Sequence, residues 1–225
     1  MNILLAAVAP VAIILLYIYY RDKYEKEPIK QLLKALAAGM FIVIPVIFVE
    51  TFLGEIRLSL ELPSQSDAFF NAFGIAAFSE EIFKFIAFLF IIWKSKDYNE
   101  RFDGIVYAVF ISLGFALVEN IKYLMNYGNE IALMRGVLAV PAHALFGVTM
   151  GYYFSLSKFS SNKKDKVKFF YFAIIFPIIL HGSYDFILMA NEPMGMLAFV
   201  PFIIFLWKTG FKRMNILSEN SRFKK

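Results

Sequence analysis

Seven long apolar segments run through the chain, and each is about long enough to cross a lipid bilayer. A hydrocarbon core of roughly 30 Å needs about 20 apolar residues in a helix. These runs are too long and too continuously apolar for barrel strands, so helices are the spanning elements that fit. The segments are residues 3–20, 32–53, 68–93, 102–125, 131–156, 167–190 and 194–210. We therefore predict an all-α, polytopic membrane bundle of about seven transmembrane helices.

The composition points to the same class of protein. Of the 225 residues, 60% are hydrophobic and 18% are charged, whereas a soluble domain has about 45–50% apolar and about 25% charged residues. The absence of cysteine excludes disulfides and thiolate metal sites. No loop is long enough for a second soluble domain, so residues 1–225 are predicted to form a single membrane domain. The first segment lacks a basic start and is longer than a signal-peptide core, which favours a retained anchor.

The basic residues alternate between the predicted loops. The first, third and fifth loops and the C-terminal tail hold most of the Lys and Arg side chains, and the even-numbered loops hold few. Because Lys and Arg mark the cytoplasmic side of a membrane protein, we predict an outside N-terminus and a cytoplasmic C-terminus. Topology thus accounts for the net charge of +5, and a nucleic-acid partner is unnecessary.

Six ionisable side chains lie inside stretches that are otherwise among the most apolar of the chain. They are Glu80, Glu81, Glu119, His143, His181 and Asp185, and they include both histidines of the chain. Inserting an Asp at the centre of a membrane helix costs roughly 2.5–3.5 kcal/mol, so such residues usually face a partner or a water-filled cavity. The six lie at similar depths in four segments, and Glu119 and Asp185 lie slightly toward the outside. We predict that they converge on one polar cavity that opens outward.

Helix spacing assigns partners within the third segment. Lys84 is four residues after Glu80 and three after Glu81, so its ammonium can reach either carboxylate. The two glutamates are about 100° apart on a helix, so one can face a cavity while the other turns toward a neighbouring helix. An ion pair that simply neutralises itself is the alternative, but one lysine cannot neutralise two glutamates.

The two histidines have different predicted surroundings. His181 and Asp185 share a helix face at a spacing of four, so the carboxylate can fix the imidazole and leave its other nitrogen for substrate, water or metal. His143 follows Pro141, and a neutral histidine bonded to the carbonyl that the proline frees is the alternative there.

Glu119 stands beside Asn120 near the outer end of the fourth segment. The alternative interpretation is that Glu119 lies at the membrane interface, with Lys122 as a surface partner.

Carboxylates and imidazoles without cysteine suit two kinds of hydrolytic chemistry. In the first, a glutamate activates water as a general base while histidines stabilise the oxyanion. In the second, His143, His181 and Glu119 hold a metal ion with a position left open for water, as in catalytic zinc sites. The sequence matches neither usual zinc-protease motif, so metal is allowed but not required. A proton- or cation-coupled transporter using the same residues is a further alternative.

The motifs resemble those of the PrsW intramembrane proteases, which belong with the CAAX prenyl proteases and bacteriocin-processing enzymes. Three motifs appear in the family's order on the third, fourth and sixth predicted helices: Glu80-Glu81-x-x-Lys84, Phe115-x-x-x-Glu119 and His181-x-x-x-Asp185. Further similarity covers residues 103–107, 112–120 and 143–145. Prenyl proteases have histidine at the place of Glu119, so the role of Glu119 does not transfer from them.

This resemblance implies a reaction and a partner. Family members cleave a single-pass anti-sigma factor on its extracytoplasmic side (site-1 cleavage) and so begin the release of an ECF-type sigma factor in a stress response. It implies a multi-pass protein of the bacterial plasma membrane. The resemblance does not decide whether the enzyme uses one zinc ion or no metal.

The roles expected for the site residues combine the resemblance with the spacing. Glu80 or Glu81 acts as general base, and Lys84 holds the other glutamate. His181, oriented by Asp185, stabilises the oxyanion or binds the metal. The site is completed by His143 and Glu119, with Asn120 in support.

Overall fold

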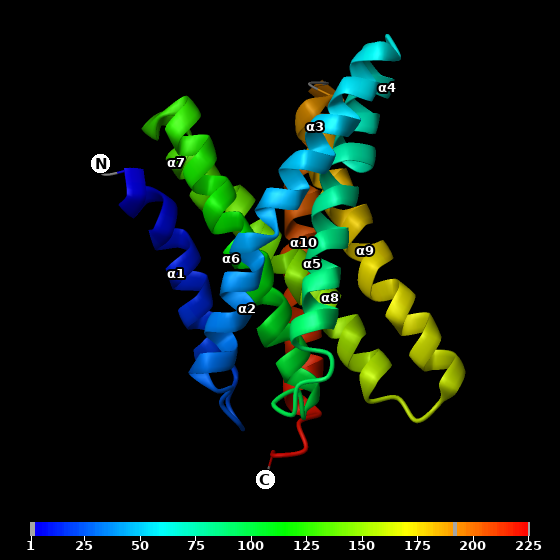
Figure 1. Ribbon diagram of the computed structural model, residues 1–225. Helices are drawn as coiled ribbons and strands as arrows, with labels where there is room; N and C mark the ends of the chain where they lie inside the picture. Colours follow the sequence, from blue (N-terminus) through cyan, green and yellow to red (C-terminus); the bar gives the residue numbers. More distant parts are fainter. Residues whose placement is uncertain (1–2, 191–192, 225) are drawn as a thin grey trace.

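The computed structural model describes residues 3–190 and 193–224, and within these ranges the regular elements are all helices (Figure 1). In chain order they are α1 (Ile3–Arg21), α2 (Ile29–Phe41), α3 (Val43–Ser59), α4 (Ser64–Phe69), the π-helix η1 (Phe70–Ala77), α5 (Phe78–Ile91), α6 (Arg101–Tyr127), the short 3₁₀ turn η2 (Asn129–Ile131), α7 (Ala132–Met134), the π-helix η3 (Arg135–Ala139), α8 (Val140–Lys158), α9 (Lys163–Met189) and α10 (Pro193–Glu219). Five stretches in the described part are long and apolar enough to cross a membrane. The predicted helical membrane bundle is confirmed.

The predicted segments 68–93 and 131–156 are each made of several helical elements, and the second and last segments also differ from the observed helices. The second segment is divided at Ile42, because Pro45 has no N–H to donate to the carbonyl of Phe41 four residues earlier. The last helix continues past residue 210 to Glu219. Its extension is amphipathic: Met214 and Leu217 are buried although the surrounding sequence is no longer continuously apolar.

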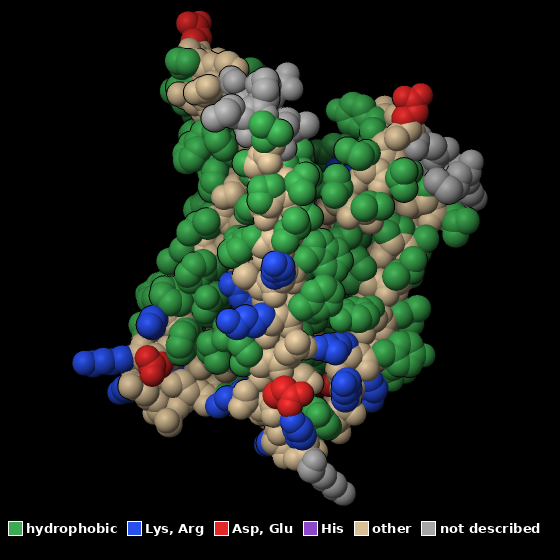
Figure 2. All heavy atoms as spheres, turned by 180° about the vertical axis from the view of Figure 1, so that it is seen from behind, with side chains coloured by type: hydrophobic (Ala, Val, Ile, Leu, Met, Phe, Trp, Pro, Cys, Tyr) green, Lys and Arg blue, Asp and Glu red, His purple; other side chains and the backbone are tan. Residues whose placement is uncertain are grey.

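Helix α6 occupies the centre of the bundle. In its most apolar stretch 78% of residues are buried, against 22% for α1. It packs against α8, α2 and α1. The outer helices expose large apolar side chains such as Ile13, Phe48 and Phe90. Green hydrophobic side chains accordingly cover the middle of the face in Figure 2, as expected of a surface in contact with lipid.

Glycines allow α6 to approach its neighbours closely. A Cβ atom added to Gly39 of α2 would lie 2.0 Å from the carbonyl oxygen of Ile111, and one added to Gly114 would lie 2.1 Å from that of Leu36. On the other side, a Cβ at Gly151 of α8 would lie 2.1 Å from the carbonyl oxygen of Gly104. Small residues at such crossings are the usual means of helix association in membranes.

Gly114→Ala is therefore expected to destabilise the fold. The added methyl group meets backbone, which cannot turn aside, so a loss of about 1–3 kcal/mol is expected from overpacking. Gly54→Ala is the matched control, because a Cβ atom added there would meet no atom of the described residues within 4 Å, and alanine favours a helix over glycine. Thermal unfolding of both variants in detergent tests this. A Gly114→Ala variant as stable as Gly54→Ala would contradict the close approach.

The two ends of the bundle differ in charge. The α1–α2, α5–α6 and α8–α9 connections and the C-terminus lie at one end, the lower end in Figure 1, which we call the basic end. Lys and Arg side chains gather toward this end in Figure 2. The distribution matches the loop pattern in the sequence. Which end faces the cytoplasm stays a prediction.

Candidate active site

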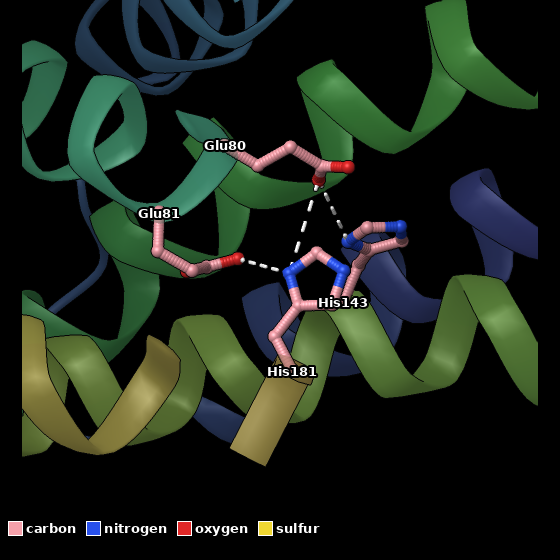
Figure 3. A group of neighbouring side chains, drawn as sticks. All are labelled: Glu80, Glu81, His143 and His181. Carbon is pink, nitrogen blue, oxygen red and sulfur yellow. Dashed lines mark hydrogen bonds and ion pairs between the residues drawn. The ribbon is translucent and has the colours of Figure 1, made fainter. Parts of the chain in front are cut away.

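Four helices bring the predicted site residues together. Glu80 and Glu81 lie in the first turn of α5, Glu119 toward the end of α6, His143 in the first turn of α8 and His181 in α9. Glu80 and Glu81 follow the π-helix η1, and His143 follows the π-helix η3. A π-helical turn changes the phase of a helix, and such turns are frequent at functional sites. Figure 3 shows the side chains from α5, α8 and α9 pointing toward one another.

Lys84 is the central cation of the site. Its Nζ atom lies 2.9 Å from Glu80 Oε2 and 2.8 Å from Glu81 Oε1, so it binds both glutamates. It also lies 3.3 Å from His143 Nδ1 and 4.3 Å from the centre of the Phe115 ring. The lysine is 1% exposed. Its charge is thus held entirely by protein groups.

His181 contacts a carboxylate at each ring nitrogen. Its Nδ1 lies 2.9 Å from Glu81 Oε1 and 3.9 Å from Glu80 Oε2, and its Nε2 lies 3.3 Å from Asp185 Oδ2. The predicted contact with Asp185 is present. The second nitrogen, which we expected to face substrate, water or metal, instead faces the two glutamates. The ring also stacks on Phe146, with 4.9 Å between centroids.

His143 bridges the lysine to a second ion pair. Its Nε2 lies 3.1 Å from Glu119 Oε2, and that carboxylate lies 2.7 Å from Arg135 Nη2. The alternative of a ring bonded to a freed backbone carbonyl is not what the structure has. Among the described residues, Glu119 forms its ion pair with Arg135 and not with Lys122.

Asn120 supports this arrangement. It accepts a hydrogen bond from Nε of Arg135 (2.9 Å) and donates one to the carbonyl oxygen of Ala7 (3.2 Å), which ties the site to α1.

These residues surround a cavity of about 720 Å³. Glu80, Glu119, His143, His181 and Asp185 line it, whereas Glu81 does not and is fully buried. The two adjacent glutamates therefore face different surroundings, as their spacing predicts. Further lining residues, among them Arg57 of α3, Tyr123 of α6 and Met189 of α9, come from helix ends that lie away from the basic end, so the cavity opens toward that opposite end.

Two ionisable cavity residues inside predicted apolar segments were not considered in the sequence analysis. Glu50 of α3 lines the cavity, and so does Arg135 of η3. Both are ionisable residues inside predicted apolar segments, so the rule that singled out the other six also applies to them. The positive charge that neutralises Glu119 is the one from η3, close in space but distant in sequence.

Four side chains could hold a metal ion. Glu80, Glu81, His143 and His181 each offer one ligand atom, and these atoms lie within 4.8 Å of one another. Imidazole nitrogens with carboxylate oxygens are the donor set of catalytic zinc. In addition, Oε2 of Glu81 is buried without a hydrogen-bond partner among the described residues. The residues fit a zinc ion, with a glutamate of α5 rather than Glu119 supplying the carboxylate.

Comparison with known proteins assigns the family. A family model described as PrsW family intramembrane metalloprotease matches residues 27–207. Protease PrsW of Oceanobacillus iheyensis is 38% identical over 221 residues, which cover 98% of each chain. Protease PrsW of Bacillus subtilis is 36% identical over 211 residues, covering 94% of this chain and 93% of the relative. That of Clostridioides difficile is 32% identical over 226 residues, covering 99% and 94%. No solved structure matches.

These relatives are named as proteases, which favours a peptidase over the transporter alternative. Their similarity extends over nearly the whole chain, and the helices provide a multi-pass membrane protein. The chain therefore belongs to the PrsW family and is an intramembrane protease of a bacterial membrane.

Proposed function

We propose that this protease cleaves a single-pass anti-sigma factor near the membrane surface toward which its cavity opens, using water activated by Glu80. The observation that carries the proposal is the position of the Glu80 carboxylate. It lines the cavity, and its Oε2 lies 2.9 Å from Lys84 Nζ, 3.9 Å from His181 Nδ1 and 4.0 Å from His143 Nδ1. A general base needs such a fixed position beside the reacting water.

The surrounding residues divide the remaining work. Glu80 takes a proton from water, the oxygen of that water attacks the peptide carbonyl carbon, and the proton passes to the leaving amide nitrogen. Glu81 is a positioning residue, since it lies outside the cavity and holds Lys84 and His181. Each ring nitrogen of His181 contacts a carboxylate, so one of these contacts must open before the ring can donate to the developing oxyanion. His143 and Glu119 complete the wall opposite.

A zinc ion is the alternative means of activating water in the same cavity. Glu80, Glu81, His143 and His181 would hold it, and when bound it would polarise the water and the peptide carbonyl. Lys84 contacts three of these four residues, so its ammonium and a metal cation compete for the same donors. Metal occupancy is therefore expected to require that Lys84 move or lose its charge.

The size and place of the cavity favour a membrane-anchored substrate. Its walls combine charged groups with apolar side chains such as Val46, Leu188 and Phe199. A segment that leaves the bilayer can present an unwound peptide bond to the charged part while its helix stays in lipid. The resemblance of the motifs to those of anti-sigma-factor proteases supplies the substrate class.

The experiment is reconstitution of the purified protein in liposomes with tagged single-pass proteins, followed by mass spectrometry of the products. We expect one cut in an anti-sigma factor near the membrane surface and none in an unrelated single-pass protein. Cleavage of both, or of neither, would contradict the substrate assignment. Metal analysis of the active protein, followed by chelation, tests the two mechanisms: activity that persists without bound metal excludes the zinc version.

A further inference from the structure

A second group of acidic side chains lies at the basic end, away from the active site. It consists of Asp22, Glu25 and Glu27 in the α1–α2 connection, together with Glu100 and Asp103 at the start of α6. We call these five residues the basal carboxylate cluster. One oxygen atom from each of Glu25, Glu27 and Asp103 lies within 4.8 Å of the other two. All members except Glu25 are at most 2% exposed.

Protein donors hold one oxygen of each carboxylate at the centre of this cluster. Glu25 Oε1 accepts a hydrogen bond from Asn99 Nδ2 (3.1 Å), and Glu27 Oε2 accepts one from the Tyr107 hydroxyl. Asp103 Oδ2 accepts from the backbone N–H of Asn99 at 2.8 Å. The second oxygen of each, namely Glu25 Oε2, Glu27 Oε1 and Asp103 Oδ1, is buried without a partner in the described part of the chain. Donors that fix one oxygen of a carboxylate while the other stays unpartnered are the usual surroundings of metal-binding carboxylates.

The remaining two members add further unpartnered oxygens. Neither carboxylate oxygen of Asp22 has a hydrogen-bond partner among the residues described, although the residue is 1% exposed. Glu100 Oε2 accepts from the Ser221 hydroxyl, but its Oε1 has no partner there either. The negative charges of Asp103 and Glu100 both raise the pKa of Asp22.

Nearby lysines form no ion pair with the cluster in the described part of the chain, and Lys26 acts on Asp22 only through its charge at longer range. The Nζ atom of Lys26 donates to the backbone carbonyls of Tyr19 and Asp22 rather than to a carboxylate. Lys158 donates to the carbonyl oxygen of Trp93 at 2.9 Å. Within residues 3–190 and 193–224, no ion pair to any of the five carboxylates is recorded. Buried charges without partners are costly, so either protons or a cation must compensate them.

We propose that the basal carboxylate cluster binds a hard divalent cation of the Mg²⁺, Mn²⁺ or Ca²⁺ class. Its donors are carboxylate oxygens alone, which suit these ions and not the softer metals that prefer sulfur or imidazole. Such an ion would join the α1–α2 connection to the first turn of α6. It would be separate from any metal of the active site, since the two groups share no residue.

Protonation is the competing state, and it gives the cation a pH signature. Burial, followed by the charge of Asp103, raises the pKa of Glu27 to about 10 and that of Asp22 to about 7. Without a cation, the stability that these protonated carboxyls contribute is full below their unfolded-state pKa values. It falls as the pH rises through the folded-state values. A bound cation removes this loss, so binding strengthens as the pH rises. The charged or titratable groups that act on these two residues are Lys26, Glu100, Asp103 and Tyr107, and those that act on the rest of the cluster or on Tyr107 are Glu25, Asp97, Lys158 and Arg222.

The test combines binding and stability of the full chain in detergent after chelation and dialysis. Mn²⁺ is titrated and its free fraction followed by electron paramagnetic resonance. Thermal unfolding is recorded with and without Mg²⁺ at pH 6 and pH 8. We expect saturable Mn²⁺ binding at this site, a midpoint rise of about 5–10 °C at saturating Mg²⁺ at pH 8, and a smaller rise at pH 6.

Variants assign the binding to residues. Glu27→Gln and Glu25→Gln are expected to lose the Mn²⁺ site and the Mg²⁺ stabilisation. In the absence of cation, Glu27→Gln is expected to be more stable than the wild type. His181→Ala removes an active-site donor, and Glu55→Gln removes an exposed carboxylate of α3. Both should keep the site. Equal binding by wild type and both cluster variants, or no binding by wild type at millimolar Mn²⁺, would overturn the proposal.

Discussion

Glu80→Gln is expected to slow peptide-bond cleavage by about 10²–10⁴-fold, the contribution of a general base. Glutamine keeps the size of the side chain and can still contact Lys84, but it cannot accept the proton from water. Glu80 lines the cavity between the two histidines, so the loss is expected in the rate of cleavage rather than in substrate binding. Initial rates on a tagged single-pass substrate in liposomes measure it.

Two further variants sharpen this result. Glu55→Gln, an exposed carboxylate of α3 outside the cavity, should cleave like wild type. Glu81→Gln should also lose activity, because it removes the carboxylate that holds Lys84 and His181. Its stability should change as well, whereas Glu80→Gln should unfold near the wild-type temperature. A Glu80→Gln variant within a few-fold of the wild-type rate would show that the base is another residue.

The sequence predicted which ionisable side chains lie near one another, because charge in an apolar helix is a strong signal. Each of the six ionisable residues lies at the predicted junction of four helices, and spacing alone paired His181 with Asp185 and placed Lys84 beside both glutamates. Their catalytic roles remain predictions.

Contacts between distant segments could not be predicted in the same way. The pairing of Glu119 with Arg135 depends on how η3 returns to α6, and local spacing suggested Lys122 instead. The approach of His181 Nδ1 to Glu81 depends on the packing of α9 against η1 and α5. No periodicity within one helix specifies either contact.

The basal carboxylate cluster illustrates a different limit. Three of its acidic residues, Asp22, Glu25 and Glu27, stand among lysines in a polar loop, and loop charges normally face water. Only the fold buries Asp22 and Glu27 against the start of α6. The basic residues at this end of the bundle predict the topology. No sequence pattern predicts that the acidic loop residues beside them are buried.

Lys84→Met is expected to cause the largest loss of stability among single substitutions in the site. Removing the ammonium leaves Glu80 and Glu81 side by side and buried, 4% and 0% exposed, without their shared cation. Breaking a buried ion pair by deleting one partner costs about 3–5 kcal/mol. Methionine fills most of the space, so the loss reflects charge rather than a cavity. Unfolding in detergent at neutral pH measures it.

The double variant Lys84→Met/Glu81→Gln separates charge from packing. Removing Glu81 together with the lysine eliminates one of the two uncompensated carboxylates, so part of the lost stability should return. The coupling between the two positions should be about 0.5–3 kcal/mol, the range for residues of one network. Additive losses would mean that Lys84 acts through packing alone.

Because the ammonium also occupies the donors that a zinc ion would need, Lys84→Met should bind zinc more tightly than wild type if the site accepts metal. Unchanged zinc affinity would separate the lysine from the metal question and leave its role with the two glutamates.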